Sequence, residues 1–174
     1  MPSGRHDGAV LTALPDPRAA LKRPSTEIPL DDLCSPVVRE ALETWRRLKG
    51  ERRMPSRADM SPRAMRGFLK YMCLLEVIDG GREFRFRVSG DVVNVQQGMS
   101  LQGITTTDWD ARLPGFGSHM RRVYQRVVRR REPVAYSGLY LRAADGHTFS
   151  HESLMAPLGD DGETVDHVIV VAAL

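Results

Sequence analysis

The sequence predicts an α+β domain: a five-stranded antiparallel sheet with a helical insertion after the second strand and an amphipathic helix before the first. Three observations support this fold class. Apolar residues recur at helical spacing early in the chain, two β-capable runs flank the turn Asp79-Gly80-Gly81, and three further runs follow later. The 174 residues, of which 41% are hydrophobic, suffice for one domain with its own core.

Residues 1–30 are predicted to form a flexible leader and residues 31–174 the single domain. Five prolines interrupt the leader, and no apolar period in it lasts more than one turn. The amphipathic helix is expected at 35–49, where Ser35-Pro36 supplies an N-cap and a first-turn proline. A second, shorter helix is expected at 61–69. We expect three residues on the stripe of the first helix to contact a partner or a second copy of the chain: Val38, Leu42 and Trp45.

The five strands are expected at 71–78, 83–88, 134–142, 148–158 and 165–172. Strict alternation in the second run places Phe84, Phe86 and Val88 on one face of the sheet. The last run is apolar on both faces, a pattern typical of a strand in the middle of a sheet. We therefore expect the last strand to pair beside the first, with the helices gathered on one face.

The insertion between Gly90 and Pro133 is expected to be mostly helical. A short helical stretch follows Gly90, and residues 105–113 are expected to be irregular. A longer amphipathic helix then runs from about 116 to 131, until Pro133 ends it.

This order of hairpin, helical insertion, three-stranded meander and central last strand resembles the PAS fold. Local motifs resemble a bacterial subfamily of single-domain PAS proteins, typical of alphaproteobacteria, over roughly residues 33–173. These motifs are the opening segment Pro55-Ser56-Arg57-Ala58-Asp59-Met60 after Trp45, the second-strand motif Phe84-Arg85-Phe86-Arg87-Val88-Ser89-Gly90, Gly98, Leu101 and Gly103 in the insertion, and Glu152, Met155 and Ala156-Pro157-Leu158 in the fourth strand. The resemblance implies a module that senses a signal or binds a protein, without a reaction of its own.

A PAS pocket lies between the concave face of the sheet and the helical insertion, and such sites are mostly apolar with a few placed polar groups. His151 shares the parity of Met155 in the fourth strand, which places it at the rim of the pocket. The same residue types also fill ordinary cores, so a plain core is the simpler interpretation and a bound small molecule the alternative. We expect six side chains to point into the pocket: Phe86, Trp109, Met120, Tyr124, Tyr136 and Met155.

The residues do not favour the cofactors of other PAS proteins. Flavin-binding photosensory PAS proteins use a reactive cysteine in the insertion, whereas Cys34 and Cys73 both lie outside it, so we do not expect flavin. Haem-binding PAS proteins often take an axial ligand from the long insertion helix, where His119 lies. A lone histidine there is more typical of a surface or capping residue, and we do not expect haem. His147 and His151 lack a nearby third ligand, so we expect no metal site.

The basic residues are concentrated in two segments, and 22 of the 25 are arginine. Residues 46–70 carry nine basic groups against two acidic ones, whereas residues 143–174 carry six acidic groups and no lysine or arginine. A basic face suits an acidic protein or a nucleotide second messenger, and nucleic acid is a further alternative because phosphate contacts need clustered cations. A solvated helix face is the plain interpretation. On the long helix the docking face is expected to comprise Arg121, Arg122, Arg126, Arg129 and Arg130.

We expect a non-enzymatic, cytoplasmic sensory or regulatory module without an attached output domain, which acts as a homodimer or through a regulatory protein. No nucleophile elbow, phosphate-cradling glycine loop or paired-carboxylate motif points to catalysis. No apolar run approaches the roughly 20 residues that cross a bilayer, and no secretory signal opens the chain. The alternative is a protein that binds nucleic acid or a nucleotide second messenger through its arginine-rich face.

Overall fold

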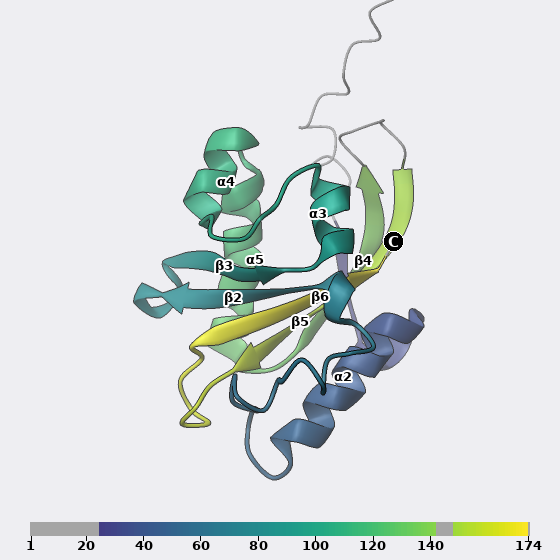
Figure 1. Cartoon of the computed structure of the whole chain (residues 1–174), viewed down its shortest axis with the longest axis vertical. Helices are drawn as coiled ribbons and strands as arrows, with labels where there is room; N and C mark the ends of the chain where they lie inside the picture. The colour runs from purple at the N-terminus through teal and green to yellow at the C-terminus, as the bar shows by residue number, and fades with distance from the viewer. Residues whose placement is uncertain (1–24, 142–147, 174) are drawn as a thin grey trace, which may run out of the picture.

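A computed structural model of the chain describes residues 25–141 and 148–173 (Figure 1). The strands are β1 (Thr26–Ile28), β2 (Met72–Ile78), β3 (Glu83–Ser89), β4 (Val134–Leu141), β5 (Thr148–Leu158) and β6 (His167–Ala173). The helices are α2 (Pro36–Lys49), α3 (Asp91–Gln97), α4 (Thr106–Arg112) and α5 (Phe116–Arg130). The strands form one antiparallel sheet in the order β1-β4-β5-β6-β2-β3, which confirms the α+β class.

The last strand, β6, occupies the centre of the sheet, as its apolar pattern predicts. It pairs with β5 on one side and with β2 on the other, so that Ile169 lies opposite both Ala156 and Leu74. Val168 and Ile169 point to opposite faces, and both are buried. The middle of the sheet is therefore apolar and covered on both of its faces.

The helices cover both faces of the sheet, which corrects the prediction that they gather on one. Helix α2 packs on the face opposite to α3, α4 and α5 (Figure 1). The indole Nε1–H of Trp45 donates to the carbonyl oxygen of Pro157 at 2.8 Å. The carboxylate of Glu152 accepts the backbone N–H groups of Cys34 at 3.0 Å and Ser35 at 2.7 Å, so a side chain of β5 caps the start of α2.

The sheet contains a sixth strand, β1, inside the segment predicted to be a leader. Thr26 pairs with Ser137 and Ile28 with Ala135 at the edge of β4. Ordered structure therefore begins before residue 31, and the predicted boundary is wrong for these residues. Three residues are too few for an apolar period, which is why the pattern did not reveal the strand. The rest of the predicted leader, residues 1–24, lies outside the described residues.

Two further elements differ from their predictions. Residues 61–69 form a series of turns instead of a helix and lead into a short 3-10 turn, Leu69–Tyr71. Residues 106–112, expected to be irregular, form α4, whose start is held by a reciprocal capping box between Thr105 and Asp108. The spacing of Thr105 and Asp108 in the sequence carried that signal, although aspartate replaces the usual glutamate.

A β-bulge near the end of β3 changes which face its last residues occupy. Leu75 pairs with Phe86 but Leu74 pairs with Val88, so one residue of β3 is left over between them. Phe84 and Phe86 are buried as predicted, whereas Val88 is 37% exposed. The strict alternation of the sequence thus holds only up to the bulge.

None of the helices within residues 25–141 and 148–173 has the length and hydropathy needed to span a bilayer.

Candidate ligand cavity

A cavity of about 340 Å³ lies between the sheet and the insertion helices α3, α4 and α5. Its volume is near the lower end of the range for ligand-binding pockets. Strands β2, β3, β4, β5 and β6 supply its floor, and β1 lies at one end. All six residues predicted for a pocket line this space: Phe86, Trp109, Met120, Tyr124, Tyr136 and Met155.

Aromatic rings form one wall of the cavity. The ring of Trp109 lies edge-on to Phe86, with centroids 5.3 Å apart, and to Phe116, with centroids 4.6 Å apart. Tyr124 makes a similar contact with Phe84 at 5.3 Å. Edge-to-face pairs of this kind stabilise by about 0.5–1.5 kcal/mol beyond the area they bury. The wall is therefore held in one arrangement and presents a rigid apolar surface.

Most titratable groups in the wall are neutral near pH 7. Burial raises the pKa of the Cys73 thiol to about 11 and also raises the pKa of the buried Tyr124 phenol. Burial raises the pKa of Tyr136 as well, although Arg126 opposes this. Burial lowers the pKa values of His119 and His151, which favours their neutral forms. The middle of the cavity is thus uncharged.

One end of the cavity is polar and is built by β1, α5 and β4. Arg126 Nη1 donates to the Glu27 carboxylate at 2.8 Å and to the Tyr136 hydroxyl oxygen at 3.0 Å. Arg130 also donates to Glu27. The hydrogen bond from Arg130 is the largest cause that lowers the pKa of Glu27, and Arg126 adds to it against a smaller opposing effect of burial. A carboxylate of β1 therefore bridges two arginines of α5 at this end of the cavity.

A second polar pair completes this end. The Ser25 hydroxyl lies 3.0 Å from His151 Nε2, and both residues line the cavity. His151 was predicted at the rim of the pocket from its parity with Met155. The sequence interpretation missed Ser25 and Glu27, because both fall in the proline-rich segment assigned to the leader. The partner of Glu27 is Arg126, and the two residues are separated by 99 positions in the chain. No local spacing in the sequence encodes that contact.

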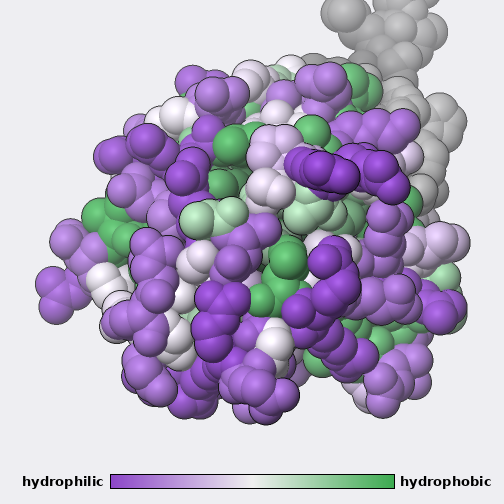
Figure 2. Space-filling model, turned by 60° about the horizontal axis from the view of Figure 1, so that its bottom comes forward, coloured by the Kyte–Doolittle hydropathy of each residue, from purple (hydrophilic) through white to green (hydrophobic). Residues whose placement is uncertain are grey.

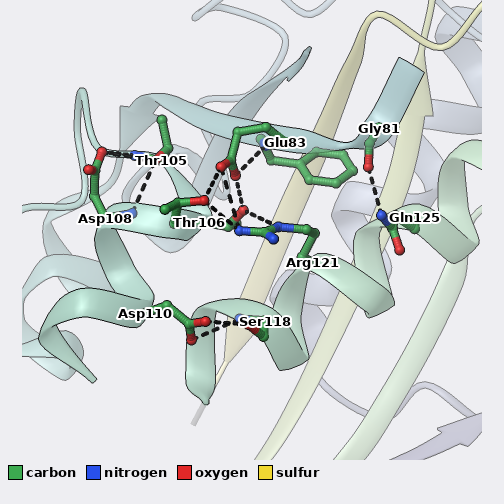
Figure 3. A network of polar contacts seen from close by, with 11 residues as sticks. Gly81, Glu83, Thr105, Thr106, Asp108, Asp110, Ser118, Arg121 and Gln125 are labelled. Carbon is green, nitrogen blue, oxygen red and sulfur yellow. Dashed lines mark hydrogen bonds and ion pairs between the residues drawn. The ribbon is translucent and has the colours of Figure 1, made fainter. Parts of the chain in front are cut away.

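A network of polar contacts holds the insertion helices in place over the sheet (Figure 3). Glu83 of β3 accepts the hydroxyl groups of Thr106 and Thr107 at the start of α4. Arg121 of α5 donates to Thr106 Oγ1 at 3.1 Å and to Thr107 Oγ1 at 2.7 Å. Helix α5 approaches α4 closely at Gly117, where an added Cβ would lie 2.0 Å from the Thr106 carbonyl oxygen. The roof of the cavity is thus fixed to the edge of the sheet.

Three of the five arginines predicted as a docking face are used inside the chain. Arg121 lies in the network with Glu83, while Arg126 and Arg130 share Glu27. Arg122 and Arg129 are exposed. Within the described residues no ion pair involves either of these two. The structure therefore does not support a docking face of five free arginines, because α5 turns most of them toward acidic residues of β1 and β3.

The predicted partner stripe on α2 is buried in the same chain. Val38, Leu42 and Trp45 are at most 4% exposed and pack in the core. These side chains hold α2 to the sheet, so in the folded chain they offer no surface to a partner. The outer side of α2 instead carries charged side chains, among them Arg39, Glu40 and Glu43. Dimerisation remains a prediction, but this stripe does not provide its contact.

The cysteines and histidines weighed from the sequence as cofactor ligands lie in different parts of the described structure. Cys34 is exposed beside α2, and Cys73 lies on β2 with a protonated thiol, so a cysteine adduct with flavin formed from the insertion is not supported. His119 lines the cavity, but about 340 Å³ is small for a porphyrin. Among the described residues no group of three metal-ligating side chains comes together. His147 of the predicted histidine pair lies outside those residues.

Two solved structures from light-oxygen-voltage proteins align with this chain. A structure described as an RNA-binding light-oxygen-voltage receptor aligns with 87% of this chain at a TM-score of 0.50 and 14% identity, and this chain spans only 38% of that one. A structure from a study of light-oxygen-voltage domains with a flavin analogue aligns with 64% of this chain and 81% of its own length, at a TM-score of 0.43 and 15% identity. The first likeness shows the fold alone.

The curated proteins contain no match to the sequence. The PAS domain family matches residues 34–171, which include helix α2, strands β2 to β5, the complete insertion and most of β6. The chain therefore belongs to the PAS domain family.

Proposed function

We propose that this chain is a sensory or regulatory PAS module that binds a small molecule in the cavity beneath α5. The observation that carries the proposal is the cavity itself, about 340 Å³ in volume, with an aromatic wall and a polar end. Binding sites for small molecules combine these properties, since apolar walls supply affinity and a few polar groups set orientation. A plain core would leave no such space, because protein interiors pack with few voids larger than a water molecule.

Binding fits the residues better than catalysis. Ser25 and His151 lie at the distance of a nucleophile and its base. The nearest carboxylate in sequence, Glu152, points to the opposite face, where it accepts the N–H groups of Cys34 and Ser35. Glu27 is occupied by two arginines. We therefore propose a module without a reaction of its own.

A sensor must pass its state to another molecule. We propose that the chain does so as a homodimer or through a regulatory protein in the cytoplasm, as a member of the single-domain bacterial type that its motifs resemble. The contact surface must lie outside the buried stripe of α2. Arginines exposed in the segment 46–70 form one candidate, and Figure 2 shows that hydrophilic residues dominate the face that carries this segment.

The ligand is tested by native mass spectrometry of protein purified from its own host. We expect a mass above that of the bare chain, which denaturation removes. Ala172→Phe places a ring in the cavity and should abolish the added mass, because Ala172 lines the space. Ala111→Phe makes the same change on the exposed side of α4 and should retain it. A bare mass in the parent, together with no thermal stabilisation by any compound of a small-molecule library, would contradict ligand binding.

A second candidate function is the binding of a nucleic acid or a nucleotide through segment 46–70. Arg57, Arg63 and Arg66 are exposed, and within the described residues no ion pair involves them. This contrasts with α5, where three arginines meet acidic residues. The light-oxygen-voltage receptor with a similar fold is described as RNA-binding, which makes single-stranded RNA a suitable probe.

A further inference from the structure

The mouth of the cavity is its polar end, where the partly exposed side chains of Arg126 and Glu27 line the space. The charges there are unequal. Two charged side chains line the cavity: the guanidinium of Arg126 and the carboxylate of Glu27, which form an ion pair. Arg130 adds a second cation to the same carboxylate. Two guanidinium groups thus share one negative charge, and the mouth keeps a surplus of positive charge. Five other side chains that line the cavity have pKa values shifted toward their neutral forms, as described above: Cys73, His119, Tyr124, Tyr136 and His151.

The resident carboxylate comes from the least firmly held strand. Glu27 lies on β1, a strand of three residues that pairs only with β4 at the edge of the sheet. Arg126, in contrast, projects from a helix of 15 residues that the Glu83 network fixes to β3. The arginine is therefore the fixed half of the pair, and the carboxylate is the half that another anion can replace.

We propose that the cavity binds a small organic acid with an apolar body, and that its carboxylate binds Arg126 in the place now held by Glu27. This inference rests on the proposed function and names the class of ligand. The aromatic wall around Trp109 and Phe86 receives the apolar body. The Tyr136 hydroxyl, 3.0 Å from Arg126, lies close enough to donate to the same carboxylate.

Other ligand classes fit the mouth less well. A ligand carboxylate loses part of its hydration when it binds, and Arg126, which is 43% exposed, replaces that hydration with a positive charge and a planar fork of donors. A cationic ligand would meet the surplus positive charge of Arg126 and Arg130. A neutral ligand would leave the pair with Glu27 unchanged and make no use of the arginine.

The test compares acids with their neutral analogues on the full chain. Octanoate and 4-phenylbutyrate are titrated by calorimetry beside octanamide and 4-phenylbutanamide, which have the same shape without the charge. We expect each acid to bind at least tenfold more tightly than its amide, since a hydrogen-bonded charge pair contributes at least that factor. Equal binding of acid and amide would overturn the inference but leave ligand binding intact.

Variants then locate the carboxylate. Arg126→Gln should weaken acid binding at least tenfold and leave amide binding unchanged, which also shows that the cavity is folded. Arg129→Gln removes an arginine of the same helix that lies outside the cavity lining, and it should bind the acids like the parent. Glu27→Gln should bind the acids more tightly, because the competing carboxylate is gone. Unchanged acid binding in Arg126→Gln, or weaker binding in Glu27→Gln, would overturn the assignment.

The experiments distinguish a failure of the acid proposal from a failure of ligand binding altogether. If no acid or amide binds the parent and the protein from its host shows only the bare mass, both this inference and the proposed ligand function are wrong. If a ligand from the host is found and carries no acidic group, only the inference is wrong.

Discussion

Single carboxylates join parts of this chain that are distant in sequence. Glu152 of β5 binds the N–H groups before α2, Glu83 of β3 binds α4 and α5, and Glu27 of β1 binds α5. In each case the acceptor lies on a strand and the donors lie on a helix or at its start. Each of these carboxylates thereby links a strand of the sheet to a helix.

The pairing of Glu27 predicts an acid-sensitive part of the stability. Its pKa is lowered in the folded chain, chiefly by Arg130 and also by Arg126. The unfolded chain therefore takes up the proton first as the pH falls, and the folded state loses this stabilisation below the ordinary glutamate pKa of about 4.3. Above that pH the contribution is complete. Glu27→Gln should thus be less stable than the parent at pH 7, and the difference should shrink toward pH 3.

Urea unfolding of both proteins between pH 3 and pH 7 measures this difference. Glu163→Gln serves as a control, because Glu163 is an exposed carboxylate whose ion pairs with Arg53 and Arg131 are long, at 3.9 and 3.8 Å. A difference between the parent and Glu27→Gln that does not change with pH would mean that Glu27 contributes through packing and not through its charge.

At the level of residues, the sequence located the apolar part of the site and missed its charged end. Phe86 and Met155 are placed by the alternation of strands, and Met120 and Tyr124 by the period of a helix, so a local pattern encodes their direction. Glu27 has no such pattern. Its role depends on Arg126 being brought to it by the complete fold, and that contact follows from topology alone.

Among the elements, β6 lies in the middle of the sheet. Both of its edges are paired and both of its faces are covered, by α2 on one side and by the cavity and α5 on the other. The apolar run that encodes it could be read directly from the sequence, because no polar face interrupts it. Helix α4 could not, since seven residues give too short a period and only the Thr105–Asp108 cap marks its start.

Ile169→Asp tests the central position of β6. Ile169 is 2% exposed and lies between strands on both sides. An unpaired carboxylate there should cost about 3 kcal/mol or more in the free energy of unfolding, measured with urea. Val95→Asp places the same charge on α3 at a residue that is 72% exposed and should change stability by less than about 0.5 kcal/mol. Similar stability of the two variants would contradict the burial of β6.

Over the whole molecule, the fold brings together charges that the sequence separates. Residues 46–70 are strongly basic and residues 143–174 acidic, and Glu163 of the acidic segment lies near both Arg53 and Arg131. These contacts are exposed and long, so each contributes little to stability. These contacts reduce the positive potential of the surface around Arg53 and Arg131. Arg57 and Arg66 are exposed and can still bind an anionic partner.

The arginines left available allow a quantitative test of the second candidate function. If they contact phosphates, the logarithm of the affinity for a single-stranded RNA probe must fall linearly with the logarithm of the salt concentration. Each phosphate contact should add about 0.7 to the steepness of this slope. Replacing Arg57, Arg63 and Arg66 by glutamine should then reduce the slope by about 2. The double change Arg122→Gln and Arg129→Gln on α5 should reduce it much less. A parent chain that binds no RNA at about 50 mM salt would exclude this function, because counterion release favours binding most strongly at low salt.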